Sequence, residues 1–291
     1  MAIETCLGQI EPFRVLAWGC GLQSTTLAAM STLGELEPLD LVLHCDLHWE
    51  RGETLRSRDR WAEWLLNRRQ QVEILDVGDV REKGSEEHIY LPFWTPAGGH
   101  LRRQCTRAMK VRPMRRHIRQ ALGYPASVPP APQAGAVKLW IGFSLDEYDR
   151  AFDDNVQYMR NRYPLIERGM TRTDCARWLR EHDLGALVPG KSACVGCPFR
   201  QASEWLDMRE TAPCEFDEAV AFDEMIRDHP LDRVTSEQLY LYKVLDLDAR
   251  RRSPLKDADL ERDAQRERQA RQLPLFWEEA TCSRILTTSA T

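Results

Sequence analysis

The sequence predicts an α/β protein with an open, mainly parallel sheet, helices on both of its faces, and a smaller helical C-terminal region. Apolar runs typical of strands alternate with helical patterns over the first half of the chain. Strand patterns stop after about residue 168, and short helical patterns follow. With 43% hydrophobic residues in 291, the chain can bury a sizeable core. We therefore expect a sheet domain over residues 1–168 and a helical region over residues 169–291.

The strands and helices of the first half follow from short apolar runs and from helical spacing. Four runs are predicted as strands: 14–18, 39–45, 72–77 and 138–143. Two helices are predicted between them, over 24–33 and 54–68. In the second helix the spacing puts one group of side chains on the buried face: Leu55, Trp61, Trp64 and Leu65.

Two further segments are defined by their composition. Residues 120–136 carry no charge and four prolines, which is typical of a loop inside the domain. Residues 246–271 are densely charged and predict a solvated helix. In the helical region, Trp178, Trp205 and Phe222 are the aromatic residues that we expect to pack.

Charge and hydropathy exclude several classes of protein. The net charge of −5, from 40 basic and 45 acidic residues, excludes a basic field over the whole molecule. A local basic patch stays open, because residues 102–119 hold eight Lys and Arg and no acid. No apolar run reaches the roughly 18–20 residues of a membrane span. The first residues lack the pattern of a signal peptide, so we expect a cytoplasmic protein without a membrane partner.

A glycine turn lies between the first predicted strand and the first predicted helix. It reads Gly19-Cys20-Gly21-Leu22-Gln23-Ser24-Thr25. Glycines allow close backbone approach, the helix start directs N–H groups outward, and two hydroxyls add donors. The turn therefore predicts a phosphate or pyrophosphate cradle. It lacks the Gly-Lys-Ser/Thr of a Walker A loop and the third glycine of a dinucleotide-binding fingerprint.

Nine cysteines are spread along the chain, and one pair has the spacing of metal ligands. Cys194 and Cys197 form a Cys-x-x-Cys pair followed by proline. This spacing lets two sulfurs reach one metal or cluster, and a redox disulfide or two unrelated core thiols are the alternatives. Buried structural thiols are expected outside recognisable ligand contexts, at Cys6, Cys20, Cys45, Cys214 and Cys282.

Several blocks occur together in one order: 16–25, 44–50, 103–113, 142–150, 163–175 and 191–199. Their sequences include Arg103-Gln104-Cys105-Thr106 and Gly142-Phe143-Ser144-Leu145-Asp146-Glu147. This order resembles the phosphoadenosine phosphosulfate reductase-like branch of the PP-loop N-type ATP pyrophosphatases, over about residues 14–210. The chain departs from that pattern at Ala17, Cys20 and Gln23, which stand for serine, glycine and, in many members, aspartate.

The resemblance implies an adenine nucleotide alpha-hydrolase-like fold and chemistry at the α-phosphate of ATP. AMP and pyrophosphate would form, with adenylylation of a substrate, for instance for sulfur transfer. The implied nucleotide contacts are Gly19, Gly21, Gln23, Ser24, Thr25, Asp46, Gly142, Asp146 and Arg150. Arg103, Lys110 and Asp46 would be catalytic, and Mg²⁺ would accompany the ATP.

The resemblance also implies a thiolate centre formed by Cys105, Cys175, Cys194 and Cys197. Four soft thiolates suit a [4Fe–4S] cluster or zinc, and the absence of any metal is the third alternative. In the resembled reductases that bind a cluster, a Cys-Cys pair precedes the lysine. Here Thr106 occupies the second position of that pair, and Cys175 would replace the missing ligand.

Two other functions stay open at this stage. A phosphoadenosine or adenosine phosphosulfate reductase would use a mobile C-terminal cysteine, for which Cys282 is the candidate, although the Glu-Cys-Gly-like tail is not seen. A non-catalytic nucleotide-binding module would account for Ala17 and Gln23 as signs of decay. Beside the adenine nucleotide, the expected partners are a nucleic acid (tRNA or DNA) or a component of a defence system. The acceptor substrate and the oligomeric state stay open.

Overall fold

The computed structural model describes residues 11–83, 90–96, 99–153, 156–228, 238–243, 245–246 and 251–272. Five parallel strands form a sheet in the order β3-β2-β1-β4-β5. Their bounds are Phe13–Ala17 (β1), Leu41–Asp46 (β2), Val72–Asp76 (β3), Val137–Ile141 (β4) and Met159–Arg162 (β5). The prediction of an α/β fold with a parallel sheet is confirmed.

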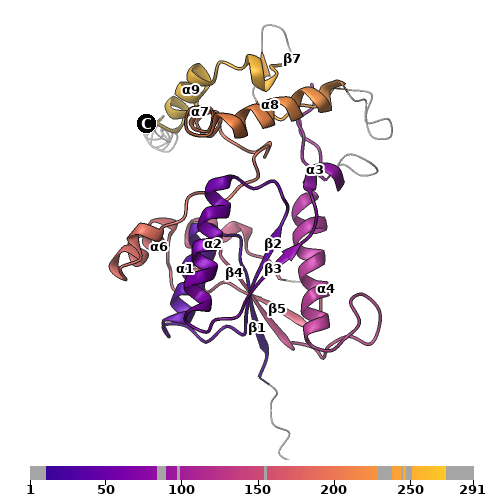
Figure 1. Ribbon diagram of the computed structural model, residues 1–291, viewed down its shortest axis with the longest axis vertical. Helices are drawn as coiled ribbons and strands as arrows, with labels where there is room; N and C mark the ends of the chain where they lie inside the picture. Colours follow the sequence, from indigo (N-terminus) through magenta and orange to yellow (C-terminus); the bar gives the residue numbers. More distant parts are fainter. Residues whose placement is uncertain are drawn as a thin grey trace, which may run out of the picture. The chain divides into compact units, whose positions relative to one another are not determined.

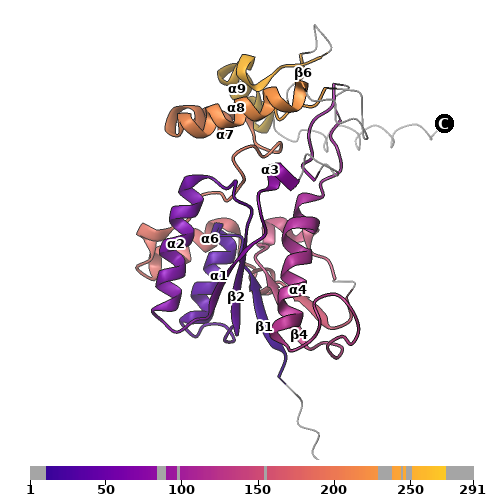
Figure 2. The same cartoon turned by 45° about the vertical axis from the view of Figure 1, so that its right-hand side comes forward.

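Helices cover both faces of this sheet. The helix α1 (Leu22–Thr32) and the helix α2 (Gly52–Leu66) lie on one face, and α4 (Arg112–Ala121) lies on the other (Figure 1). The helix α6 (Arg172–Glu181) packs beside α1, as Figure 2 shows from a second side. Shorter pieces complete this part of the chain: α3 (Val80–Lys83), α5 (Pro164–Glu167), a π-helix η1 (Thr106–Val111), and the 3₁₀ turns η2 (Leu145–Arg150) and η3 (Gly185–Leu187).

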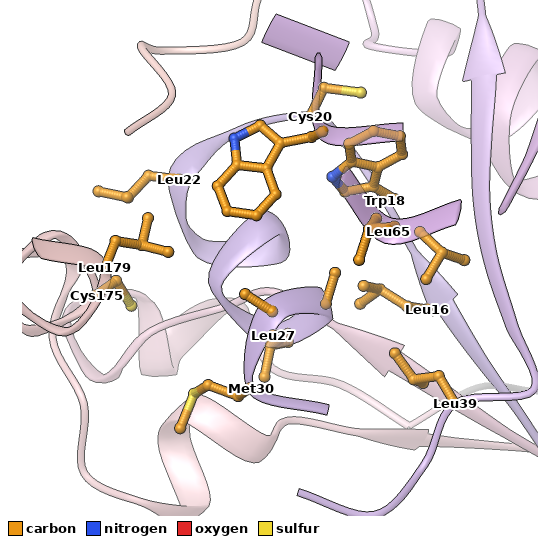
Figure 3. Packing of buried hydrophobic residues seen from close by; sticks show 14 of the residues in the cluster. Leu16, Trp18, Cys20, Leu22, Leu27, Met30, Leu39, Leu65, Cys175 and Leu179 are labelled. Atoms are coloured by element: carbon orange, nitrogen blue, oxygen red, sulfur yellow. The ribbon is translucent and has the colours of Figure 1, made fainter. Parts of the chain in front are cut away.

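The helix α1 is the centre of the main hydrophobic core. It carries no charged residue, and every residue from Leu22 to Ser31 is buried. A helix that is uncharged all round can be buried on all sides, which is what its composition favours. The strands β1 and β4 and the helices α2 and α6 contribute Leu16, Trp140, Trp61, Leu65, Cys175 and Leu179 to the same core (Figure 3).

The chain divides into two compact units. The first contains residues 1–92 and 101–196, and the second contains residues 93–100 and 197–291. The division differs from the boundary expected at residue 168, because α6 packs on α1 and therefore belongs to the first unit. The loop of residues 120–136 lies within the first unit, as expected.

The second unit contains α7 (Ala202–Thr211), α8 (Pro213–Asp228), the 3₁₀ turn η4 (Leu255–Asp257) and α9 (Leu260–Gln272). Its core includes Trp205, Met208 and Phe216. The carboxylate of Asp223 is fully buried, and it accepts hydrogen bonds from the backbone N–H groups of Leu241 at 2.7 Å and Leu255 at 3.0 Å. This single side chain therefore fixes two loop segments to α8.

Three expectations for the elements need correction. The strand β5 was not predicted, because its sequence Met-Arg-Asn-Arg lacks an apolar run. Strands also occur after residue 168, since β6 (Leu245–Asp246) and β7 (Arg251–Arg252) form a short antiparallel pair. In the charged segment 246–271, the described residues include β7 and η4 as well as α9, and α9 buries Leu260, Asp263 and Ala264 instead of being solvated all round.

Candidate functional site

The turn between β1 and α1 has the backbone geometry of an anion cradle. Gly21 occupies the N-cap position with an extended backbone, and no side chain caps the helix. The N–H group of Thr25 donates to Gly21 O at 3.0 Å. The N–H groups earlier in a first helical turn have no partner within the helix, and they lie at the positive end of its dipole. An anion placed here would meet several aligned donors.

The two hydroxyl residues of this turn differ in placement. Thr25 is fully buried, and its Oγ1 accepts a hydrogen bond from Trp18 Nε1 at 3.0 Å. Ser24 is 8% exposed, and its hydroxyl donates to Gly21 O at 3.3 Å. Thr25 therefore fastens the helix start to Trp18, whereas Ser24 stays the better candidate for a phosphate contact.

The turn lies where the strand order of the sheet reverses. Chain connections from β1 and β4 leave in opposite directions, and open α/β sheets bind ligands at the carboxyl ends of such strands. Gly142 follows β4 directly. A methyl group at Gly142 would lie 2.7 Å from Ser24 N and 2.8 Å from Ser24 Cα. Because Gly142 has no side chain, the end of β4 can lie close to the first turn of α1.

Gln23 connects the turn to two other segments. Its Nε2 donates to Glu147 Oε2 at 2.8 Å and to Ser144 Oγ at 3.3 Å. Its Oε1 accepts from Arg172 Nη1 at 2.7 Å. Sequence reasoning did not single out Arg172 as a site residue, since 149 positions separate it from Gln23.

The segment after β4 carries two further residues expected to contact the nucleotide. Asp146 Oδ1 accepts the backbone N–H of Arg172 at 3.1 Å. A hydrogen bond from Ser144, together with that backbone donor, holds the pKa of Asp146 below its usual range. Arg150 forms an ion pair with Glu147, and its guanidinium lies 4.5 Å from the ring centroid of Phe143. Both predicted residues therefore lie in one polar group with Gln23 and Arg172.

Asp46, at the end of β2, is part of an ion pair. Its Oδ2 accepts from Arg58 Nη1 at 2.6 Å, and its Oδ1 accepts from the backbone of His48 at 2.9 Å. Burial would raise the pKa of Asp46, but the hydrogen bonds from His48 and Arg58 outweigh it and lower the pKa. Asp46 is therefore ionised, and its charge is already paired.

Lys110 is half-buried and lies at the end of a line of polar side chains, of which Glu50 and His44 are buried. Its Nζ is 3.5 Å from Glu50 Oε1, and Glu50 Oε2 is 3.6 Å from His44 Nε2. His44 Nδ1 in turn lies 3.2 Å from Cys20 Sγ and 2.9 Å from Trp18 O. Burial alone would lower the pKa of Lys110, but the neighbouring Glu50 carboxylate is the main cause that raises it, and the pKa lies above its usual value. Lys110 therefore stays positively charged.

Cys20 and Cys45 are buried, as expected, yet they lie next to this line. Burial raises the pKa of Cys20, and it raises that of Cys45 to about 11. Cys45 Sγ lies 3.6 Å from Lys110 O. Cys20 has a φ angle of 57°, a left-handed conformation that favours glycine, at the position where the resembled pattern has glycine. Both thiols stay protonated in this environment.

A strap formed by residues 190–196 runs along the cradle and the segment after β2. A methyl group on Gly21 would lie 3.6 Å from Ser192 Cβ. Cys194 pairs with Glu50 through an antiparallel β-bridge, which puts their side chains on the same side. The backbone N–H of Val195 donates to Trp49 O at 2.8 Å. The strap therefore brings Cys194 to the Glu50–Lys110 pair.

The predicted thiolate centre is not assembled in the described part of the chain, where no three Cys, His, Asp or Glu residues are grouped to hold a metal. Cys105, Cys194 and Cys197 are partly exposed. The N–H of Cys105 donates to Tyr90 O at 2.8 Å, at the start of η1. Arg103, in the same segment, is exposed. Cys6 and Cys282 lie outside the described residues.

Cys175 differs in its surroundings from the partly exposed Cys105, Cys194 and Cys197. It is fully buried, and Figure 3 shows it in the core near Leu22 and Leu179. Burial raises the pKa of its thiol to about 12, so the thiol is protonated in this environment. The core position favours a packing role for Cys175, and its place among the four expected ligands stays a prediction.

We expect Cys175→Ala to leave the metal content unchanged and to lower stability. Removing a buried sulfur leaves a small cavity in the core, at a cost of roughly 1–2 kcal/mol. Metal analysis and thermal unfolding check the two parts separately. Cys194→Ala is the matched variant for the metal measurement. Equal loss of metal in Cys175→Ala and Cys194→Ala would show that Cys175 is a metal ligand.

The fold and the site define an α/β protein with an anion cradle at the reversal point of a parallel sheet. No protein-family model and no curated protein matches the chain. Among solved structures, the U34-tRNA thiolase NcsA from Methanococcus maripaludis, determined with its [4Fe-4S] cluster, is similar at 9% identity and a TM-score of 0.40. The match covers 83% of this chain and 80% of that chain.

None of the helices in the described ranges is long and apolar enough to cross a membrane.

Proposed function

We propose that the chain is an ATP-dependent enzyme of the PP-loop type that acts at the α-phosphate of the nucleotide. An acceptor attacks the α-phosphorus, the bond to the β-phosphate oxygen breaks, and pyrophosphate leaves. With water as the acceptor the products are AMP and pyrophosphate; any other acceptor stays adenylylated until a second nucleophile forms a bond to it and AMP leaves. The proposal is supported by the residue pattern given above and by the geometry at the carboxyl ends of β1 and β4.

One observation carries the proposal. The uncapped first turn of α1 lies at the reversal of strand order, in direct contact with the segment that follows β4. Anions bind at such helix starts because the backbone N–H groups and the helix dipole act together. A leaving pyrophosphate at this turn would be stabilised by donors that are already oriented.

Lys110 is the proposed source of positive charge near the transferred group. It is charged, and Glu50 restrains its position. Such a fixed charge stabilises negative charge that develops during phosphoryl-group chemistry. Arg103 stays a candidate for a second contact in the same role, on an exposed segment.

Two carboxylates at the site are already engaged by cationic or amide partners. Asp46 is paired with Arg58, and Glu147 is paired with Arg150 and Gln23. Gln23 Oε1 is occupied by Arg172. We propose that the magnesium expected with ATP enters as a complex with the phosphates.

The proposed metal ligands are the three partly exposed cysteines, Cys105, Cys194 and Cys197. Three thiolates suit zinc or an iron–sulfur cluster. A cluster beside an adenylylating site would suit sulfur transfer to the acceptor. Iron, sulfide and zinc analysis of protein purified without oxygen distinguishes the two metals.

A nucleic acid, either tRNA or DNA, is the proposed acceptor. The basic run of residues 102–119 supplies the charge for phosphate contacts, and Arg112 and Arg116 are exposed on α4. Arg119 takes no part, because its guanidinium is buried and donates to the carbonyl groups of Pro125, Val128 and Pro130.

Incubation with ATP is expected to yield AMP and pyrophosphate, measured by nucleotide chromatography. ADP as the main product would contradict the proposal, because it requires attack at the γ-phosphate. Binding without turnover, with and without added tRNA or DNA, would favour the non-catalytic module. Sulfite release from phosphoadenosine phosphosulfate with a thiol reductant would favour the reductase.

A further inference from the structure

The first residue of α6 reaches the phosphate cradle from a rigid base. Arg172 follows the N-cap Thr171, whose hydroxyl and Asp174 form a capping box that fixes the helix start. Its backbone N–H donates to Asp146 Oδ1 at 3.1 Å, and its guanidinium donates to Gln23 Oε1 at 2.7 Å. The side chain is half-buried. The backbone of Arg172 is therefore held by η2, and its side chain is held by the glycine turn.

The amide of Gln23 is oriented by its neighbours. Gln23 is 9% exposed, and its Nε2 donates to Glu147 Oε2 at 2.8 Å. The reversed amide would direct Nε2 at a guanidinium and Oε1 at a carboxylate, so each contact would become repulsive. The carbonyl oxygen of Gln23 is therefore directed at Arg172.

Gln23 is uncharged, so its hydrogen bond to Arg172 does not neutralise the charge of the guanidinium. An aspartate at position 23 would form a salt bridge with Arg172 and would repel Glu147. Glutamine instead accepts from the guanidinium and donates to Glu147, so it separates the cation from that anion. Asp146 is the carboxylate that stays near Arg172, and it contacts its backbone.

The guanidinium also has donors to spare. It carries five N–H donors in a planar fork that matches phosphate oxygens. Among the described residues, Gln23 is its one hydrogen-bond partner, through Nη1. Gln23 is the second residue of α1, within the turn whose backbone N–H groups form the cradle. The turn itself contains no lysine or arginine, so a side-chain cation at this point has to come from another segment.

We propose that Arg172 contacts the β- and γ-phosphates of the bound nucleotide and that Gln23 is its positioning residue. This inference rests on the proposed function, and it adds a residue that selects for the polyphosphate chain. The guanidinium and the backbone donors of α1 would hold the phosphates from two sides. Arg172 supplies the side-chain charge that a Walker lysine supplies in other phosphate loops.

The test is calorimetric titration of the full chain with ATP and, separately, with AMP. Arg172→Gln is expected to weaken ATP binding tenfold or more, as the loss of a charged hydrogen bond does. AMP binding is expected to stay within about twofold, because AMP lacks the β- and γ-phosphates. Arg177→Gln is the matched control, since Arg177 lies on the same helix with a side chain 60% exposed and pairs with Asp174. This control is expected to bind both nucleotides as the unaltered chain does.

Two variants test the positioning role of Gln23. Gln23→Glu keeps an acceptor for Arg172, but the new carboxylate neutralises the charge of the guanidinium. ATP binding is therefore expected to weaken about as much as in Arg172→Gln. Gln23→Leu removes the acceptor, and the double variant Gln23→Leu/Arg172→Gln is expected to bind ATP no more weakly than Arg172→Gln alone. Additive losses would show that Gln23 acts independently of Arg172.

Failure of this inference differs from failure of the proposed function. If the unaltered chain binds ATP and Arg172→Gln binds it equally well, the assignment of Arg172 is overturned and the proposed function is not. Equal losses for ATP and AMP in Arg172→Gln would also overturn it, by showing a merely structural role. If the unaltered chain binds no ATP, both are overturned.

Discussion

Replacing Gly142 with alanine is expected to abolish ATP binding and to lower stability. The added methyl group would lie 2.7 Å from Ser24 N and 2.8 Å from Ser24 Cα. Both are backbone atoms of a helix that is buried on all sides, so no flexible side chain can move aside. Overpacking of this kind costs roughly 1–3 kcal/mol. The strain acts on the turn that is proposed to hold the phosphates, so binding suffers more than folding.

Gly185→Ala is the matched control for this prediction. Its methyl group would lie 3.4 Å from the nearest atom, Arg180 Cγ, which belongs to a flexible side chain. The control is expected to bind ATP normally. Calorimetry gives the affinity, and circular dichroism shows whether each variant is folded. A folded Gly142→Ala protein with unchanged ATP affinity would contradict the close contact between Gly142 and Ser24.

Replacing Asp223 with alanine is expected to unfold the second unit or to lower its unfolding temperature by many degrees. The carboxylate is fully buried and accepts the backbone N–H groups of Leu241 and Leu255. Without it, two buried donors lose their acceptor, at a cost of about 1–3 kcal/mol for each. Arg227, whose Nε lies 3.6 Å from Asp223 Oδ2, also loses this ion pair, although its hydrogen bond to the backbone O of residue 223 stays.

Asp217→Ala is the control on the same helix, because Asp217 is exposed. Its effect is expected to stay within about 0.5 kcal/mol. Unfolding is followed by circular dichroism, and the nucleotide affinity of the first unit is measured beside it. Equal midpoints for the two variants would show that the buried carboxylate is dispensable.

Sequence patterns predicted the four strands of the parallel sheet that contain an apolar run and missed the one that does not. The strands β1, β2 and β4 have buried residues in short apolar runs, so their strand character is visible in the sequence. The strand β5 at the sheet edge has two arginines among its four residues, and its pairing with β4 is a long-range effect. The position of α6 likewise follows from packing on α1, which no local pattern encodes.

The sequence predicted which loops form the candidate site, but it did not predict which side chains contact one another there. The glycine turn and Gly142 follow from local sequence, whereas the partners of Gln23 and Lys110 lie far along the chain. For Cys175 a signal was present. It lies three and four positions before Trp178 and Leu179, which puts all three on one helix face, and all three are buried. Helical spacing alone predicts packing for this thiol.

The short segment 93–100 has a consequence for the way the polypeptide is made. It belongs to the second unit, although the ribosome makes it before residues 101–196 of the first unit. Trp94 and Tyr240 exchange backbone hydrogen bonds at 2.8 and 3.0 Å across 146 positions of sequence. On the ribosome, Phe93 and Trp94 therefore emerge long before the helices that complete their unit. A truncated protein ending at Gly196 would keep these two aromatic residues without that unit, so an isolated nucleotide-binding fragment should also replace them with polar residues.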